Sequence, residues 1–188
     1  MSQRKNKPIL NLEWLYIVYG YEASTDCAEK NWDTRIPFVA ALICTVLYWR
    51  VGKVIMALEG LSNILPTVIS LLIGFTVMFI TILLTNDSKH IQRLREYETD
   101  KVFYNKAINL YQKLLIQFSY LLLLEVVLLL SVFAYLFLKG LVIPQLLAVL
   151  LLLLQIYLIL HILLSILRGM TNLYFSFFND IDDIEDID

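Results

Sequence analysis

Residues 114–138 read LLIQFSYLLLLEVVLLLSVFAYLFL, and residues 141–167 read LVIPQLLAVLLLLLQIYLILHILLSIL. Glu125 is the one charged residue in the two runs when His161 is counted as neutral. Each run is longer than the roughly 20 apolar residues that a helix needs to cross a hydrocarbon core. Lys139 and Gly140 separate them, so the stretch predicts an antiparallel pair of transmembrane helices.

The composition of the whole chain agrees with that prediction. Of its 188 residues, 59% are apolar and 17% are charged, and the mean hydropathy is +0.70. A soluble domain is about half apolar and about one-quarter charged. The composition therefore excludes a soluble enzyme, a disordered chain and a secreted disulfide scaffold, and it leaves an integral membrane protein.

Two further runs complete a four-span prediction. Residues 64–84 contain no charged residue, whereas the run from residue 36 is free of charge only as far as Trp49. That first run can span if it continues to residue 58, with Gly60 ending the helix and Gly169 ending the last one. The predicted fold is an all-α transmembrane bundle with helices at 36–58, 64–84, 114–138 and 141–167.

The distribution of Lys and Arg predicts the orientation. With four spans, twelve basic residues lie on the side that holds both termini and the middle loop, and three (Arg50, Lys53 and Lys139) lie on the other. Basic residues accumulate on the cytoplasmic side of a membrane. Both termini and the middle loop are therefore expected in the cytoplasm, in a bacterial inner membrane.

Three cytoplasmic regions follow from this topology. Residues 1–35 are basic and contain an aromatic stretch, 8–21, which predicts either an amphipathic helix along the inner face or a segment packed on the bundle. Residues 85–113 lack Gly and Pro and predict a helical stem that continues into the third span as one long helix. Residues 169–188 form an aromatic and then acidic tail.

The stem and the tail are candidate docking surfaces for a partner. Isoleucines recur every third residue among the tail acids, a spacing that indicates a segment that orders on a basic partner, the alternative being a disordered acidic end. The charged face of the stem is either a solvated surface or a second docking face. The candidate docking residues are Arg93, Arg95, Asp180, Asp182, Asp183, Glu185, Asp186 and Asp188.

Three polar residues inside the predicted spans are the candidates for a functional role there. Glu125 and Gln155 are expected at similar depth, with His161 nearer the cytoplasm. They predict either a proton or cation relay or a structural hydrogen bond between helices. Arg50 and Lys53 either line an outer mouth or extend to the interface.

The sequence carries no motif that would mark an enzyme. We find no His/Cys/Asp/Glu cluster at metal-ligand spacing, no phosphate-binding loop and no nucleophile elbow. We therefore expect no catalytic activity, no cofactor, no metal and no direct contact with nucleic acid. The expected partners are the lipid bilayer, further copies of the chain and a cytoplasmic protein.

Together, the small size, the four spans with both termini inside, the cytoplasmic extension after span two and the absence of catalytic motifs resemble the membrane subunit of the Kiwa anti-phage defence system of bacteria. The resemblance covers the whole chain and is architectural. It implies a homotetramer that senses phage-linked disturbance of the membrane and holds a cytoplasmic DNA-binding effector.

The leading hypothesis is thus an inner-membrane scaffold and sensor that recruits a soluble effector in anti-phage defence. One alternative is a small oligomeric ion channel or pore-forming effector, with Glu125 and Gln155 or Arg50 and Lys53 along its path. A third possibility is a superinfection-exclusion or immunity protein of the membrane.

Overall fold

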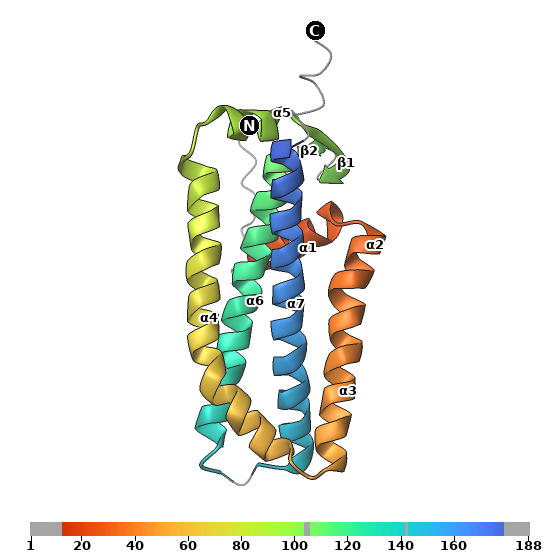
Figure 1. Cartoon of the computed structure of the whole chain (residues 1–188), viewed down its shortest axis with the longest axis vertical. Coiled ribbons are helices and arrows are strands. Elements are labelled where there is room, and N and C mark those ends of the chain that lie inside the picture. Colours follow the sequence, from red (N-terminus) through yellow and green to blue (C-terminus); the bar gives the residue numbers. More distant parts are fainter. Residues whose placement is uncertain (1–12, 104–105, 142, 179–188) are drawn as a thin grey trace, which may run out of the picture.

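The computed structural model describes residues 13–103, 106–141 and 143–178. Four helices stand side by side: α3 (Ile36–Arg50), α4 (Val54–Thr85), α6 (Leu110–Leu138) and α7 (Gln145–Phe178) (Figure 1). The elements packed near one end of them, called the head below, are α1 (Glu13–Ser24), α2 (Cys27–Lys30), α5 (Lys89–Glu96), β1 (Glu98–Phe103) and β2 (Lys106–Asn109). The single π-helical turn η1 (Asn31–Arg35) joins α2 to α3.

Three of the helices are long and apolar enough to cross a membrane: α4, α6 and α7. This confirms the all-α, membrane-spanning character expected from hydropathy. Their predicted bounds were too short, since α4 begins ten residues earlier, at Val54, and α6 begins at Leu110. The helices extend beyond the apolar runs because a helix can continue through polar residues once it leaves the hydrocarbon layer.

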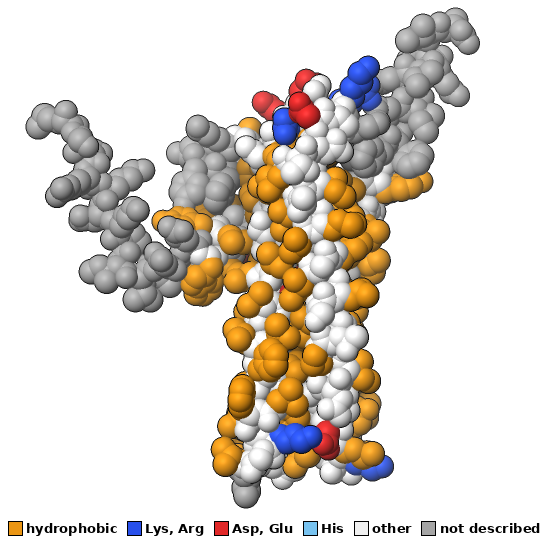
Figure 2. Space-filling model, turned by 90° about the vertical axis from the view of Figure 1, so that its left-hand side faces the viewer, with side chains coloured by type: hydrophobic (Ala, Val, Ile, Leu, Met, Phe, Trp, Pro, Cys, Tyr) orange, Lys and Arg blue, Asp and Glu red, His pale blue; other side chains and the backbone are white. Residues whose placement is uncertain are grey.

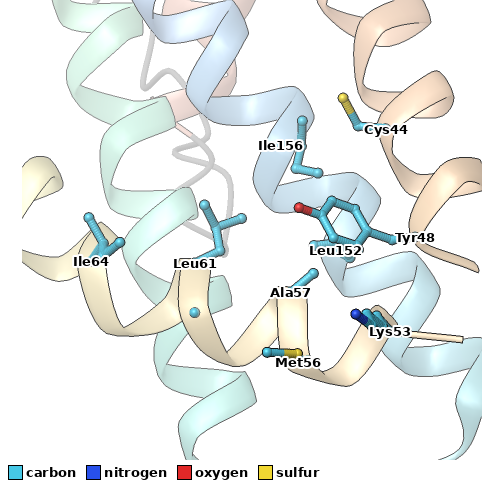
Figure 3. Close-up of a pocket in the computed structure, with 10 residues that line it drawn as sticks. Cys44, Tyr48, Lys53, Met56, Ala57, Leu61, Ile64, Leu152 and Ile156 are labelled. Carbon is cyan, nitrogen blue, oxygen red and sulfur yellow. The ribbon is translucent and has the colours of Figure 1, made fainter. Parts of the chain in front are cut away.

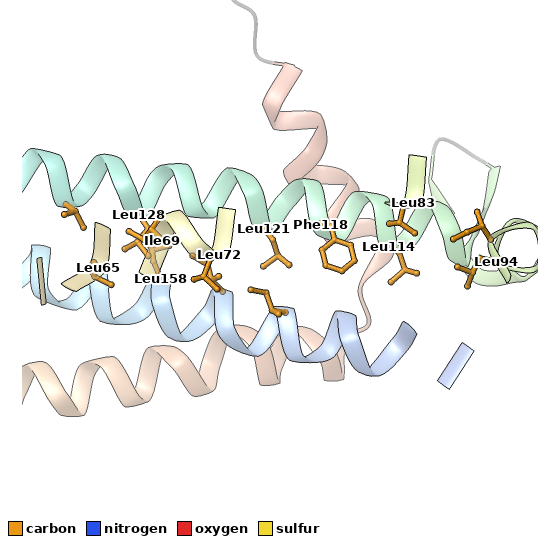
Figure 4. Packing of buried hydrophobic residues seen from close by; sticks show 14 residues of the cluster. Leu65, Ile69, Leu72, Leu83, Leu94, Leu114, Phe118, Leu121, Leu128 and Leu158 are labelled. Atoms are coloured by element: carbon orange, nitrogen blue, oxygen red, sulfur yellow. The ribbon is translucent and has the colours of Figure 1, made fainter. Parts of the chain in front are cut away.

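Helix α6 packs against both α4 and α7 and lies between them in Figure 1, while α3 packs against α7. Figure 4 shows the buried side chains of this packing. Leu114, Phe118, Leu121 and Leu128 follow one another at intervals of four, three and seven residues, so they lie on one face of α6. They meet apolar side chains of α4 and α7, such as Ile69 of α4. In lipid, such close packing stabilises helix association, because burying apolar groups away from acyl chains brings no hydrophobic gain.

The predicted first span, 36–58, is wrong at its C-terminal end. Helix α3 ends at Arg50, and α4 has already begun at Val54. Between them Gly52 adopts a φ of +69°, a left-handed conformation that terminates helices and that glycine adopts without steric cost. Gly60, the expected terminator, lies within α4.

Gly52 therefore offers a direct test of this turn. Replacing it by alanine should lower the free energy of unfolding by about 1 kcal/mol, because the left-handed conformation disfavours a Cβ. A Cβ at Gly52 would meet no atom within 4 Å, so backbone strain is the whole expected effect. Unfolding of detergent-solubilised protein measures it. Gly74→Ala, in the interior of α4, is the matched control and should not destabilise.

The continuous helical stem expected over residues 85–113 is also wrong. This segment forms α5, followed by the antiparallel hairpin of β1 and β2, and α6 starts afresh at Leu110. A capping box starts it: the Asn109 side chain accepts from the Gln112 backbone N–H at 2.8 Å, and the Gln112 side chain accepts from the Asn109 backbone N–H at 3.2 Å. Thr99 and Val102, which favour strands, lie in β1.

The last helix does not end at Gly169 as expected. Helix α7 continues to Phe178, and Gly169 lies where α6 and α7 approach closely. A Cβ at this position would lie 3.1 Å from Gln117 Nε2 and 3.4 Å from Phe118 Cζ. The glycine thus serves helix packing, as small residues do in membrane bundles. The tail acids from Asp180 to Asp188 lie outside the described residues.

The aromatic N-terminal stretch forms α1, which packs against α6 and β1. Tyr21 is buried on the inner side of this helix. Trp14, Tyr16 and Tyr19 are exposed. Residues 8–12 of the predicted helix lie outside the described part of the chain.

Candidate functional site

The most unusual group near the head is a buried carboxylate, Asp33, which is 4% exposed. It lies in the π-helical turn η1, where the backbone is wider than an α-helix. Single π-helical turns within α-helices are frequent at functional sites. Buried acids are rare unless they are paired, so Asp33 directs attention to its partners.

Three side chains converge on the Asp33 carboxylate. The hydroxyl of Tyr21 donates to Oδ2 at 3.0 Å, the hydroxyl of Ser165 donates to the same oxygen at 3.4 Å, and Arg168 Nη1 forms an ion pair with it. Arg168 Nη2 also donates to the Tyr21 hydroxyl at 3.0 Å. Burial raises the pKa of Tyr21, so its hydroxyl stays protonated and can donate.

The backbone of Asp33 has a partner of its own. Its carbonyl oxygen bonds His161 Nδ1 of α7. Pro37 lies four residues after Asp33 and has no N–H, so it cannot supply the usual helical bond to this carbonyl. Because a carbonyl only accepts, His161 Nδ1 carries the proton, and in the neutral ring Nε2 accepts from the Tyr120 hydroxyl at 3.2 Å.

These contacts form one connected group, called the polar node below: Tyr21, Asp33, His161, Ser165 and Arg168. The node joins α1 of the head, the η1 turn and the span α7 through bonds between residues that are far apart in sequence. Aromatic rings enclose it, since Tyr21 stacks on Tyr120 with ring centroids 3.9 Å apart. Such a desolvated ion pair fixes the relative position of the elements that carry it.

The three predicted intramembrane residues are all buried, but they do not form the expected group. Glu125 accepts from the Thr76 hydroxyl at 2.8 Å, and Gln155 accepts from the Ser62 hydroxyl at 3.3 Å. Ser62 and Thr76 are fourteen positions apart on α4, so the two pairs lie at different levels. Glu125 Oε2 and Gln155 Nε2 have no hydrogen-bond partner among the described atoms. His161 belongs to the polar node instead.

The other predicted site residues lie at the two ends of the molecule. Arg50 and Lys53 are exposed at the turn between α3 and α4, opposite the head (Figure 1). Arg93 and Arg95 lie on α5 in the head, where Arg95 pairs with Asp87 at 3.4 Å and lies 5.0 Å from the centre of the Tyr111 ring. The part of the chain that the structure describes contains no cluster of metal-ligating side chains.

Two ion pairs attach the parts of the head to one another. Lys101 of β1 pairs with Asp26, which precedes α2, and Lys113 of α6 lies 3.4 Å from Glu29 of α2. The Lys101 ammonium bonded to Asp26 lowers the pKa of that carboxyl. The Lys101–Asp26 ion pair thus links the hairpin to the segment that leads through α2 into η1 and the polar node.

The depressed pKa of Asp26 has a consequence for the pH dependence of the head. A carboxyl whose pKa is lower in the folded state stabilises that state above its unfolded pKa, and this contribution is lost as the pH falls through the folded pKa. We expect hydrogen-exchange protection of β1, corrected for intrinsic exchange rates, to fall below about pH 4. Asp26→Asn should show weaker protection at neutral pH and lack this acid transition. An unchanged profile in Asp26→Asn would contradict the assignment.

Sequence reasoning did not single out Asp33 or Arg168 as site residues. Two signals were present: Pro37 frees the Asp33 carbonyl, and Arg168 is the first base after the long charge-free run of α7. Neither signal indicates the partner, since the two residues are far apart in sequence. No protein-family model, curated protein or solved structure matches the chain.

Proposed function

We propose that this chain is a multi-pass membrane scaffold and sensor that recruits a soluble protein at its head. The observation that carries this proposal is the polar node, in which Asp33 and Arg168 join the turn above α3 to α7 by a buried ion pair. A change in the tilt of α7 relative to α3 would move these charges apart in a poorly solvated setting. The bilayer and the head are thereby mechanically coupled.

The proposal includes α3 as a fourth span. From Ile36 to Arg50 the helix rises about 22 Å, and η1 and α2 continue it toward the head. Its outward side chains are apolar and exposed, as lipid-facing residues are, and include Phe38, Leu42 and Leu47. The short apolar length of α3 is sufficient for a span because the one carboxylate of η1, Asp33, faces Arg168 inside the molecule and not the lipid.

The proposed orientation puts the head in the cytoplasm. Arg50, Lys53 and Lys139 are the basic residues at the end away from the head, whereas the other described bases lie at the head end. Figure 2 shows charged side chains at the two ends of the molecule and an apolar surface between them. The exposed aromatic face of α1, with Trp14, Tyr16 and Tyr19, fits a helix at the inner membrane interface.

The architectural resemblance to the membrane subunit of the Kiwa system gives the proposal a biological context. In that context the chain forms a homo-oligomer, a tetramer, in the bacterial inner membrane. Its partner is a cytoplasmic DNA-binding effector of anti-phage defence, so the chain itself need not touch nucleic acid. The head and the acidic tail are the surfaces available to that partner.

Affinity purification under mild detergent tests this function. The full chain should retain a soluble protein, and removal of residues 180–188 combined with Arg93→Glu should release it. Arg50→Glu, at the opposite end of the molecule, is the matched control and should retain the partner. The proposal fails if no soluble protein is retained, or if the control and the head variant lose it equally.

An ion channel is the second candidate function. The observation in its favour is that Glu125 Oε2 and Gln155 Nε2 are buried polar atoms without a hydrogen-bond partner in the described part of the chain. Ionisable groups inside a span are frequently functional. If the chain conducts, planar-bilayer recordings of the purified protein should show currents that Glu125→Ala abolishes. Silent recordings from verified oligomers would leave the scaffold as the better account.

A further inference from the structure

A groove opens on the side of the bundle between α3, α4 and α7, near the end away from the head (Figure 3). Its volume is about 550 Å³. Leu152 and Ile156 of α7 form its floor, and Cys44 and Tyr48 of α3 form one wall. The rim is open to the surroundings, since Met56 of α4 is 69% exposed.

The groove exists because α4 leaves α3 soon after the turn. In Figure 1 the first part of α4 slants away from α3, and its remainder rises beside α6. Two of the α4 residues that line the groove are small, Ala57 and, three positions later, Gly60, beside the larger Met56, Leu61 and Ile64. A Cβ added at Gly60 would meet no atom within 4 Å, so the chain itself leaves this space unfilled.

The depth of the groove corresponds to one leaflet of a bilayer. Ile156 lies eleven residues after the start of α7 at Gln145, a rise of about 16 Å. Half of a hydrocarbon core of about 30 Å is about 15 Å. A wedge of this kind inside the hydrocarbon layer, lined mainly by apolar side chains, has the dimensions of a phospholipid acyl chain.

Positive charge lies at the mouth of the groove. Lys53 is one of the lining residues, and Arg50 lies in the same turn. Within the described part of the chain neither side chain forms an ion pair with an acid. By contrast, Lys139, which lies at the same end of the molecule, pairs with Glu59 at 2.8 Å. If a lipid acyl chain occupied the groove, its phosphate would therefore lie next to the Lys53 ammonium.

We propose that this groove binds an anionic phospholipid from the leaflet at the α3–α4 turn. One acyl chain lies along Leu152 and Ile156 over the space left by Ala57 and Gly60, and the phosphate contacts the Lys53 ammonium. Arg50 adds to the local positive potential, which favours a lipid with net negative charge over a zwitterionic one. This site goes beyond the recruitment of a partner at the head, because it lies at the other end of the molecule.

Native mass spectrometry of the full chain, delipidated and then titrated with phosphatidylglycerol or phosphatidylcholine, tests the site. The wild type should retain phosphatidylglycerol preferentially. Lys53→Gln should weaken its retention about fivefold, since one basic residue near a lipid surface contributes about 1 kcal/mol. Ala57→Phe, which fills the groove, should abolish retention of both lipids.

Two controls keep the result specific. Lys139→Gln removes a base at the same end but outside the groove, and Leu71→Phe enlarges an exposed residue of α4 away from it; both should retain the lipid as the wild type does. Equal retention by wild type, Lys53→Gln and Ala57→Phe would overturn the proposal. So would loss of the oligomer in Ala57→Phe with lipid retention unchanged, because a second copy would then occupy the groove. Neither failure affects the test of the head by partner purification.

Discussion

Replacing Asp33 by alanine is expected to destabilise the folded protein by about 3 kcal/mol or more. The Arg168 side chain is 14% exposed, so the substitution would leave a guanidinium largely out of water with its ion-pair partner removed. The hydroxyls of Tyr21 and Ser165 would lose their acceptor as well. Removing one member of a buried pair costs far more than the pair contributes, because the remaining charge is uncompensated.

Chemical or thermal unfolding in detergent measures this loss. Glu22→Ala, an exposed acid on the neighbouring α1, is the control and should change stability by less than about 0.5 kcal/mol. The double variant Asp33→Leu with Arg168→Met should recover most of the stability, because it removes both charges and keeps apolar volume. If Asp33→Ala proves as mild as Glu22→Ala, the ion pair is not a buried structural element.

The same variants separate stability from function. The scaffold proposal expects the double variant to fold and insert but to respond differently at the head, since no charge pair then links η1 to α7. Partner retention by the double variant, compared with wild type before and after a change in bilayer thickness, reports this coupling. Identical responses would mean that the polar node only holds the fold together.

The spans could be predicted from sequence because the bilayer imposes a simple rule. A backbone in hydrocarbon must satisfy its own hydrogen bonds, so a long apolar run can only be a helix. This rule located α4, α6 and α7 but not their ends. Two glycines could have ended the first helix, Gly52 and Gly60, and only the backbone conformation of Gly52 distinguishes them.

The region outside the hydrocarbon was harder to predict because that rule does not apply there. Residues 98–109 lack Gly and Pro, which favoured a helix. Residues 98–103 and 106–109 instead form two strands that pair with each other, and β1 packs against α1. The capping signal at Asn109 and Gln112 was readable in the sequence and would have marked the start of α6. Tertiary packing decides strand formation in such short segments.

The polar node was out of reach for a different reason. The bonds that link Tyr21 and Asp33 to α7 join residues separated by more than one hundred positions, and sequence spacing carries no information on such pairs. Depth along a helix was a better guide for Glu125, which is buried as expected. It could not show that Thr76 of α4, rather than Gln155, is its partner.

Replacing Gly169 by leucine is expected to cost about 2–3 kcal/mol and to separate α6 from α7 next to the polar node. At this position a Cβ alone would lie 3.1 Å from Gln117 Nε2, which is already close for a non-bonded contact. The larger side chain must displace the Gln117 amide, which donates to the Ser165 carbonyl at 2.9 Å. Because Ser165 also donates to Asp33, the displacement reaches the node itself.

A graded series at Gly169 distinguishes crowding from a general intolerance of larger side chains. Gly169→Ala should be intermediate, since a shift of a few tenths of an ångström accommodates a methyl group, whereas Gly169→Leu requires the helices to move apart. Gly74→Leu is the matched control, because a Cβ at Gly74 of α4 meets no atom within 4 Å. Gly169→Leu should have a clearly lower free energy of unfolding in detergent than either Gly169→Ala or Gly74→Leu. It should also retain less of the soluble partner than either of them. Equal stability of Gly169→Leu and Gly74→Leu would mean that α6 and α7 can part there without cost, and the node could then not transmit movement of α7 to the head.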